Sequence, residues 1–306
     1  MGRMPLLKIT VPPSLDGLAA KDVLRTFGHL SASNLRMLRD RGGLSLNGTE
    51  IPGYARVSAG DVLSADLSDP PSNAPVLAGT PPEILYADDW FAAVNKPAGI
   101  ATHASTFHPG EETMHERMAA LWGEKMVYHP VNRLDRHTSG VMCVARCGYM
   151  HEQMKSLLHT DGFVRVYLAL CVGKLPDRRG VVDLPIGRAE GSVLKRTAGL
   201  GAQALTDYRV LSEGGGRSLV LLRPRTGRTH QIRVHMSALN CSLAGDFLYG
   251  DESEAPRTLL HSAAIRLVHP ITGDTVRVFA DLPADMQNYM ARFGLEFDTS
   301  EDLFDV

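Results

Sequence analysis

The chain is 306 residues long, and 44% of its residues are hydrophobic while 22% are charged. This composition is typical of a globular protein and excludes a disordered or fibrous chain. No stretch approaches the roughly 18 consecutive apolar residues of a membrane-spanning helix, and the N-terminus lacks the apolar run of a signal peptide, so we expect a cytoplasmic protein that does not bind a membrane.

The length suits two domains, because one domain usually holds about 100–200 residues. The four cysteines include no CxxC pair, and the twelve histidines include no HExxH motif. Zinc sites usually need such spacings. We therefore expect reduced cysteines and no bound metal.

The net charge of −2 does not by itself suggest a nucleic-acid partner, since such proteins usually carry a basic surface. The charge is unevenly distributed, however. Residues 281–306 hold seven acids and one arginine, so they carry −6 and the remaining 280 residues carry +4. Acidic tails are commonly solvated and mobile. We expect residues 284–306 to form such a tail beside a mildly basic body.

Residues 14–69 have the pattern of a small separate module. Apolar residues recur at helical spacing over residues 15–27, and Ser33 can cap a second helix. Residues 44–48 alternate and end in an Asn-Gly turn, and a second strand pattern covers residues 57–63. This order of elements resembles a small RNA-binding module that a ribosomal small-subunit protein also contains. The second helix carries three arginines that suit phosphate contacts, although an ordinary solvated helix face is the alternative: Arg36, Arg39 and Arg41.

A linker follows this module. Residues 70–82 contain five prolines and almost no apolar periodicity. Such a segment is semi-rigid where the prolines cluster. We place the domain boundary here and expect the module to swing relative to the rest of the chain.

The second domain, residues 83–283, shows more strand patterns than helix patterns. Amphipathic helices are predicted for residues 114–121 and 149–159. Strands are predicted for residues 141–145, 164–172, 205–211, 218–222, 260–268 and 275–279. Several strands are joined by short connections, so we expect an α+β protein with a mixed, largely antiparallel sheet, preceded by a small α+β module.

The densest polar chemistry lies in Arg133–Gly140, immediately before the strand pattern of residues 141–145. Asp135 falls on the loop ahead of that strand, among two arginines, a histidine and two hydroxyl groups. Catalytic groups are often placed on loops that a rigid strand supports. Taken alone, the stretch favours a carboxylate that caps a turn and pairs with a neighbouring arginine over a catalytic one.

Five stretches in a fixed order resemble the RluA type of pseudouridine synthase, and together they cover residues 83–283. They are Ile84–Asp89 with Asn95–Gly99, Arg133–Gly140, Tyr167 within Val166–Leu170, Gly227–His235, and Gly245–Asp246 with Tyr249–Gly250. One position departs from the family pattern: Asn132 stands where the family more often has histidine. We expect this departure to affect loop packing rather than the catalytic carboxylate.

The resemblance implies an RNA-uridine isomerase in which Asp135, Tyr167 and Arg233 are catalytic. Asp135 would act at C1′ and C6 of the uridine, either as a nucleophile or as a stabiliser and base, and Arg233 would support its ionised form. Tyr167 would stack on the uracil and assist removal of the C5 proton, although a tyrosine packed beside Leu157 or Leu158 is the plain alternative.

Four further residues are expected to bind the substrate. The resemblance implies that Arg133 fills the gap left by a flipped base, although a structural pair with Asp88 is an alternative. Ile232 would line the pocket under the base. Arg228 and His230 would orient the loop around Arg233.

Residues 199–204 fit the GxGxxA form of a dinucleotide-binding turn, but a strand pattern follows where a helix is required. We therefore expect no nucleotide or other cofactor, and structured RNA, ribosomal or transfer, as the partner of a monomer. The alternative from another functional class is a non-catalytic RNA-binding protein that retains the fold.

Overall fold

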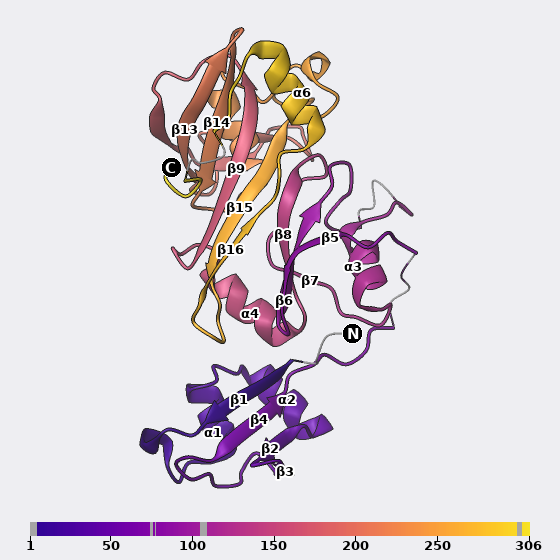
Figure 1. Ribbon diagram of the computed structural model, residues 1–306, viewed down its shortest axis with the longest axis vertical. Helices are drawn as coiled ribbons and strands as arrows, with labels where there is room; N and C mark the ends of the chain where they lie inside the picture. The colour runs from indigo at the N-terminus through magenta and orange to yellow at the C-terminus, as the bar shows by residue number, and fades with distance from the viewer. Residues whose placement is uncertain (1–4, 74–75, 77, 105–108, 299–301) are drawn as a thin grey trace.

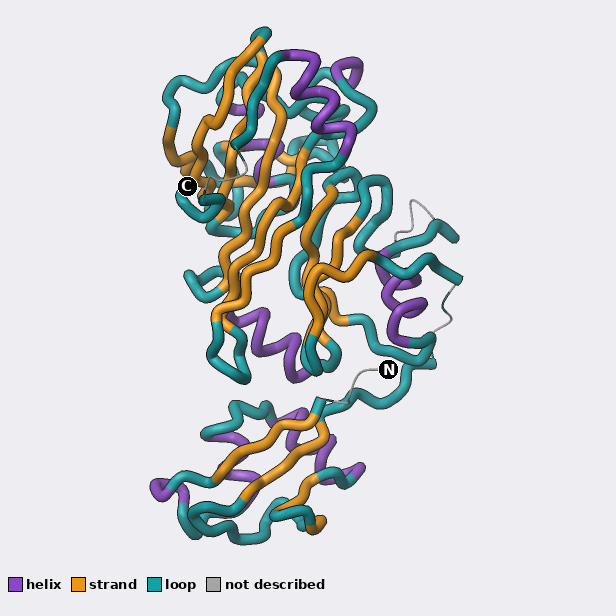
Figure 2. Tube along the Cα trace, in the orientation of Figure 1, coloured by secondary structure: helices purple, strands orange, loops and turns teal. Residues whose placement is uncertain are grey.

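The computed structural model describes residues 5–73, 76, 78–104, 109–298 and 302–306. They form a small N-terminal module and a larger part built on one long sheet (Figure 1). Helices flank that sheet on both faces and at its ends (Figure 2). Within these ranges, no helix is both long and apolar enough to cross a membrane.

The N-terminal module is a four-stranded antiparallel sheet with the order β1-β4-β2-β3, accompanied by two helices. It begins earlier than the predicted residue 14, because β1 is its first strand and pairs with the inner strand β4. Its elements are β1 (Leu6–Thr10), η1 (Pro13–Leu15), α1 (Ala20–Thr26), α2 (Ala32–Arg41), β2 (Leu44–Leu46), β3 (Thr49–Glu50) and β4 (Val62–Asp66).

Two local signals in the module can be compared with the structure. The Asn47-Gly48 turn joins β2 to β3, and both residues have positive φ, as a tight hairpin turn of this kind requires. The predicted cap of the second helix was wrong by two residues. The side chain of Ser31, not Ser33, accepts a hydrogen bond from the backbone N–H of Asn34.

The module packs against helix α4 (Gly148–Leu157) of the larger part rather than hanging from a free hinge. The Tyr149 hydroxyl donates to the Gly28 carbonyl at 2.8 Å, and Asn34 donates to Glu152 at 3.2 Å. One apolar cluster contains Leu24 of the module together with Met150 of α4. The linker alone therefore did not reveal that the two parts share a packed boundary.

The larger part is α+β, and its long sheet is largely antiparallel, as predicted. The strand order is β10-β13-β14-β9-β15-β8-β6-β5, and β16 and β7 pair with β15 and β8. The strands of this sheet are β5 (Glu83–Ala87), β6 (Phe91–Lys96), β7 (His129–Pro130), β8 (Ser139–Ala145), β9 (Phe163–Val172), β10 (Arg179–Asp183), β13 (Leu205–Gly214), β14 (Arg217–Pro224), β15 (Leu260–Val268) and β16 (Thr275–Phe279).

The remaining elements lie around this sheet. A separate hairpin pairs β11 (Ile186–Arg188) with β12 (Arg196–Ala198). The turn of residues 199–204 then leads into strand β13, so the helix that a dinucleotide-binding turn requires is not formed there. The other helices of the larger part are α3 (Met114–Trp122), α5 (Gln231–Ala238), η2 (Glu252–Glu254) and α6 (Ala284–Phe293).

The start of β8 fixes the end of the Asp135 loop. Among the described strands, β8 and β15 make the parallel pairing of the long sheet, where Ser139 aligns with His261 and Gly140 with Ser262. Gly140 has φ +106°, and a Cβ at this position would collide with the Ser262 carbonyl. Only glycine allows the two backbones to approach so closely.

The C-terminal residues pack onto the sheet, which the expected mobile acidic tail did not anticipate. Helix α6 buries Met286, Tyr289 and Met290 against an apolar cluster that includes Val166 and Leu168 of β9. These strand residues alternate with Tyr167, which belongs to the cluster on the opposite face of the sheet. The described acids of residues 281–298 and 302–306 thus lie on segments whose apolar side chains are part of the core.

Candidate active site

A cleft of about 810 Å³ opens on the side of β9 opposite to α6. Its walls come from the loop before β8, from β9, from α4 and from the segment that joins β14 to α5. The cleft therefore brings together three of the sequence stretches singled out above, from positions about 100 residues apart. The predicted site residues that line it are Arg133, Asp135, Tyr167, Arg228, His230, Ile232 and Arg233.

Asp135 lies on the floor of this cleft, where its carboxylate keeps 31% of its exposure. One carboxylate oxygen, Oδ2, accepts a hydrogen bond from Arg233 Nη1 at 3.3 Å and lies 3.9 Å from His230 Nε2. The other oxygen, Oδ1, makes no hydrogen bond within the described residues. The carboxylate is thus both accessible and next to a fixed cation, which is what an anionic catalytic group requires.

Arg233 is held mainly by Asp246, a residue to which the sequence alone gave no role. Nε and Nη2 of Arg233 donate to the two carboxylate oxygens of Asp246 at 2.8 and 2.7 Å. Asp246 is fully buried and also accepts the backbone N–H groups of Leu248 and Tyr249. This two-pronged pair fixes the guanidinium plane and leaves Nη1 pointing at Asp135.

Two aromatic rings complete the setting of Arg233. Its guanidinium carbon lies 5.3 Å from the centre of the Phe247 ring and 5.2 Å from that of Tyr249. Burial alone would lower the pKa of Arg233, but its bonds to Asp246 and the charge of Asp135 raise the pKa above the ordinary value. Arg233 is only 4% exposed and stays charged.

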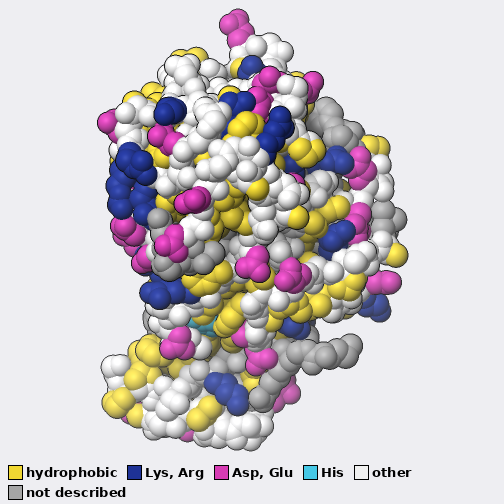
Figure 3. Space-filling model, turned by 45° about the horizontal axis from the view of Figure 1, so that its top comes forward, with side chains coloured by type: hydrophobic (Ala, Val, Ile, Leu, Met, Phe, Trp, Pro, Cys, Tyr) yellow, Lys and Arg dark blue, Asp and Glu magenta, His cyan; other side chains and the backbone are white. Residues whose placement is uncertain are grey.

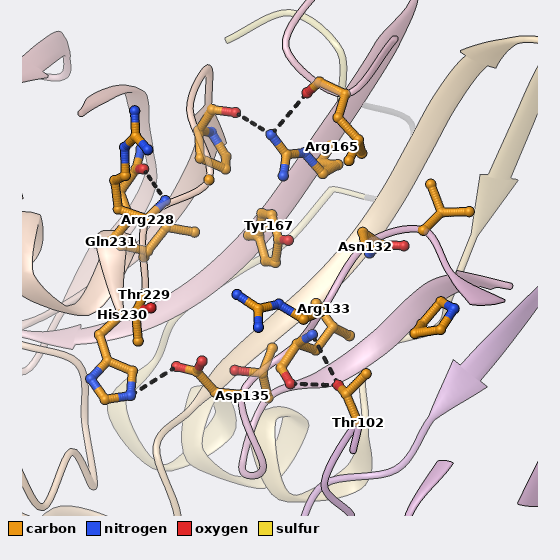
Figure 4. Close-up of a pocket in the computed structure, with 18 of the residues that line it drawn as sticks. Thr102, Asn132, Arg133, Asp135, Arg165, Tyr167, Arg228, Thr229, His230 and Gln231 are labelled. Atoms are coloured by element: carbon orange, nitrogen blue, oxygen red, sulfur yellow. Dashed lines mark hydrogen bonds and ion pairs between the residues drawn. The ribbon is translucent and has the colours of Figure 1, made fainter. Parts of the chain in front are cut away.

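His230 begins helix α5 in a left-handed conformation with φ 58°. Its Nδ1 lies 3.0 Å from the Tyr249 hydroxyl, which fixes the ring with Nε2 toward Asp135 (Figure 4). Burial lowers the pKa of His230 although the Asp135 charge opposes this shift, so the ring is largely neutral at neutral pH. We expected His230 only to orient the loop around Arg233. In the structure its Nε2 also lies within 4 Å of the Asp135 carboxylate.

Tyr167 and Ile232 form the apolar wall of the cleft. Both are 6% exposed and belong to one apolar cluster with Leu134. Leu157 and Leu158 pack against a different apolar cluster. The alternative in which the Tyr167 ring packs beside these leucines therefore does not agree with the clusters of the structure. Burial raises the pKa of the Tyr167 phenol, so its hydroxyl is protonated at neutral pH.

Lys96 supports the Asp135 loop from below. It is fully buried, and its Nζ donates to the carbonyls of Pro97, Ile100 and Arg136 at 2.9, 2.6 and 3.1 Å. Three acceptors match the three N–H bonds of an ammonium group. Burial lowers the pKa of Lys96 to about 7, and the Asp135 charge works against this shift. The sequence stretch Asn95–Gly99 contains this residue but gave no indication of its contacts.

The two other predicted arginines of the cleft are exposed. Arg133 makes no ion pair within the described residues, and Asp88 bonds instead to Tyr86 and His269, so the proposed structural pair between Arg133 and Asp88 is absent. Arg228 donates to the Gln203 carbonyl at 3.0 Å. Figure 4 shows Arg133 between Tyr167 and Asp135.

Asn132, the departure from the family pattern, has a packing role in this structure. Its side-chain oxygen accepts from the Cys143 N–H at 2.8 Å, and its nitrogen donates to the Val141 carbonyl at 3.4 Å. It therefore ties the loop that holds Asp135 to β8 and makes no hydrogen bond to Asp135.

The three arginines of the N-terminal module lie outside the cleft, on α2. All are exposed: Arg39 pairs with Asp40, and Arg41 donates to the Ser68 carbonyl at 2.5 Å. Arg36 has no ion pair among the described residues. No group of three or more His, Cys, Asp or Glu side chains in the described part of the chain could hold a metal ion.

Comparisons with known proteins give a consistent result. Residues 91–238 match the family of RNA pseudouridylate synthases. The chain is 35% identical over 250 residues to the uncharacterized RNA pseudouridine synthase YjbO of Bacillus subtilis (strain 168), covering 80% of this chain and 88% of that one. It is 30% identical over 309 residues to ribosomal large subunit pseudouridine synthase D of Zymomonas mobilis, covering 93% and 96%.

A solved structure is also similar. The structure of human RNA pseudouridylate synthase domain containing 4 matches with a TM-score of 0.57 and 28% identity, over 70% of this chain and 94% of the human one.

Proposed function

Because this chain belongs to the RluA type of RNA pseudouridine synthases, we propose that it isomerises uridine in the RNA of the large ribosomal subunit, with Asp135 as the catalytic carboxylate. The family membership makes the chain an RNA pseudouridine synthase. The ribosomal substrate is supported by relatives in Zymomonas mobilis and Vibrio parahaemolyticus that carry this substrate in their names. Transfer RNA is the alternative substrate.

The observation that carries the catalytic assignment is the accessible Asp135 carboxylate beside a cation that a second carboxylate holds in place. The reaction breaks the bond between N1 and C1′, turns the base, and joins C5 to C1′. An ionised carboxylate can serve it by attacking the nucleoside or by stabilising positive charge at C1′. The free oxygen of Asp135 is available for either step, because Arg233 engages only the other oxygen.

Tyr167 supplies a flat ring at the wall where the uracil would lie. Burial raises the pKa of its phenol, so the hydroxyl can take up the C5 proton only as it gives up its own. We infer that the ring holds the base and that the hydroxyl assists transfer of the C5 proton to solvent water in the open cleft. Ile232 would cover the opposite side of the uracil.

A uridine in structured RNA has to leave its stack to reach Asp135, at a cost of a few kcal/mol. Arg133 is exposed at the mouth of the cleft and has no competing ion pair among the described residues. It is therefore free to occupy the space that the flipped base leaves. The exposed Arg36 on α2 would extend the RNA contact to the N-terminal module.

The test is the substitution Asp135→Asn, which keeps the shape of the side chain and removes its charge. We expect the variant to fold, to bind RNA with similar affinity and to release no tritium from RNA labelled at uridine C5. The matched control is Asp89→Asn, at an exposed position outside the cleft, which should retain the parent rate.

The substrate is identified by mapping. Pseudouridines would be located by carbodiimide-stopped reverse transcription in a strain that lacks the gene. Loss of a stop in large-subunit ribosomal RNA supports the proposal, and loss of a stop in transfer RNA instead would contradict the ribosomal substrate. Tritium release by Asp135→Asn near the parent rate would remove Asp135 from the mechanism.

A further inference from the structure

Arg165 is a buried cation in the wall of the active-site cleft, and no step described above uses it. It lies on β9 two residues before Tyr167, so both side chains project from the same face of the strand. Arg165 is 8% exposed and lines the same cleft as Asp135. Figure 4 shows it on the far side of Tyr167 from Asp135.

The hydrogen bonds of Arg165 leave much of its guanidinium group unused. Nη2 donates to the backbone carbonyls of Leu158, Pro224 and Thr226 at 3.3 to 3.4 Å, which is long for an arginine. Nε is buried and has no partner, and Nη1 makes no hydrogen bond within the described residues. These contacts position the side chain but do not satisfy it.

No acidic side chain in the described part of the chain forms an ion pair with Arg165. Among the lining residues of the cleft there are six Lys or Arg side chains and one acid, Asp135, which already faces Arg233. The neighbouring His159 cannot supply a negative charge. Burial and the Arg165 charge both lower its pKa, which favours the neutral ring. On the face drawn in Figure 3, basic and acidic side chains are interspersed.

A buried charge without a counter-ion is costly, and proteins normally pair it. A ligand that brings an anionic group to this end of the cleft would give Arg165 a counter-ion in the complex. The Nη1 group of Arg165, which makes no hydrogen bond among the described residues, can donate a charge-assisted hydrogen bond to a phosphate oxygen.

We propose that Arg165 binds a backbone phosphate of the RNA strand, at a linkage adjoining the flipped uridine. This site rests on the proposed function, because it assumes that the uracil lies against Tyr167 with its ribose at Asp135. The strand then runs past Tyr167 toward Arg165, and the phosphate replaces the missing carboxylate. Lys155 and Arg228, which line the cleft nearby, add to the positive potential there.

The first experiment measures the salt dependence of kcat/KM for tritium release with an RNA transcript that contains the mapped uridine. In Arg165→Gln we expect kcat/KM to fall about 10- to 100-fold, as for a lost hydrogen bond to a charged group. The plot of log kcat/KM against log KCl concentration should become shallower by about 0.7, the value for one phosphate contact in a single strand. Arg165→Lys, which keeps the charge, should retain the parent slope.

The control is Arg277→Gln, which makes the same change of charge at an exposed position on β16, outside the cleft. It should leave both kcat/KM and its salt dependence at the parent values. A purely structural role for Arg165 predicts a lower kcat/KM with an unchanged salt slope, and that outcome would overturn the assignment.

The second experiment locates the phosphate. A synthetic stem-loop carries one neutral methylphosphonate linkage, placed either on the 5′ or on the 3′ side of the target uridine. One of the two should reduce kcat/KM of the parent about as much as Arg165→Gln does, and the same linkage should cost the variant nothing further. If both linkages affect parent and variant equally, Arg165 does not contact either phosphate.

Failure of this inference can be told apart from failure of the proposed function. If the parent releases no tritium from ribosomal RNA, the ribosomal substrate is wrong, and the same variants are compared on bulk transfer RNA. If the parent turns over and the salt slopes of parent and Arg165→Gln coincide, only the phosphate site is wrong.

Discussion

The pair of Arg233 and Asp246 offers the sharpest test of how the site is built. Asp246→Asn keeps an oxygen for the N–H groups of Leu248 and Tyr249, but it places an amide N–H group against the arginine donors. Arg233 then loses its bond from Nε and the negative charge of its partner, and it keeps the bond from Nη2 to the remaining oxygen and the longer bond to Asp135. Removing one partner of a buried ion pair costs about 3–5 kcal/mol, so we expect the free energy of unfolding to fall by that amount.

Turnover should fall as well, although Asp246 does not line the cleft. Without the two-pronged hold, the guanidinium group can turn toward Asp135 and engage both of its oxygens. A displacement of about 1 Å at a catalytic group can cost roughly 100-fold in rate. Urea unfolding and tritium release measure the two effects separately.

A double variant and a control complete this test. Arg233→Met combined with Asp246→Asn should be less destabilised than the sum of the single variants by about 2–3 kcal/mol, while turnover stays lost. Asp207→Asn is the matched control, because Asp207 makes a bidentate pair of similar length with the exposed Arg225 outside the cleft. Additive losses of stability in the double variant would refute the pairing as the source of both effects.

Two further predictions concern residues that support the Asp135 loop. The pKa of Lys96 is lowered to about 7 in the folded protein against about 10.4 in an unfolded chain, so between these values the unfolded state binds more protons and stability rises with pH. From pH 7.5 to 9, urea unfolding should therefore show the parent gaining about 1–2 kcal/mol relative to Lys96→Met; equal gains in both would contradict the burial argument. Arg257 donates to the His137 carbonyl and pairs with Asp285, so Asp285→Asn should loosen this support and lower kcat about three- to tenfold. The free energy of unfolding should fall by only about 1 kcal/mol, because Asp285 is partly exposed. The control Asp281→Asn should change neither kcat nor the free energy of unfolding.

The sequence predicted most of the sheet because its strands carry strong local signals. The pattern of residues 164–172 became β9, and that of residues 275–279 became β16 with the same bounds. Helix α6 was missed for a physical reason: its buried residues Met286, Tyr289 and Met290 are separated by exposed polar ones, and the surrounding acids suggested a solvated tail. Helix α6 is held in place by its contact with an apolar face of β9, which lies more than 100 residues earlier in the chain.

The site was predictable only in part, for a related reason. The motif order placed Asp135, Tyr167 and Arg233 in one region, and the structure brings them to one cleft. Asp246 could not be assigned, since its bond to Arg233 depends on how the segment after α5 folds back. Lys96 was equally hidden, because its three partners are backbone carbonyls, which leave no trace in residue identity.

The negative net charge of the chain is compatible with an RNA substrate because the sheet separates the charges. Along β9 the side chains alternate, so that Tyr167 and Arg165 face the cleft while Val166 and Leu168 face α6. Asp285 lies on α6 and Asp305 on the segment that follows it, and both pair with arginines. Layers that pack on a sheet lie about 10 Å away, which is close to the distance over which salt screens exposed charges. Two of the six cations that line the cleft are paired with acids outside it, Arg233 with Asp246 and Arg136 with Glu111. The other four have no ion pair among the described residues, so an RNA strand at the cleft meets a positive surface that the sum over the whole chain does not describe.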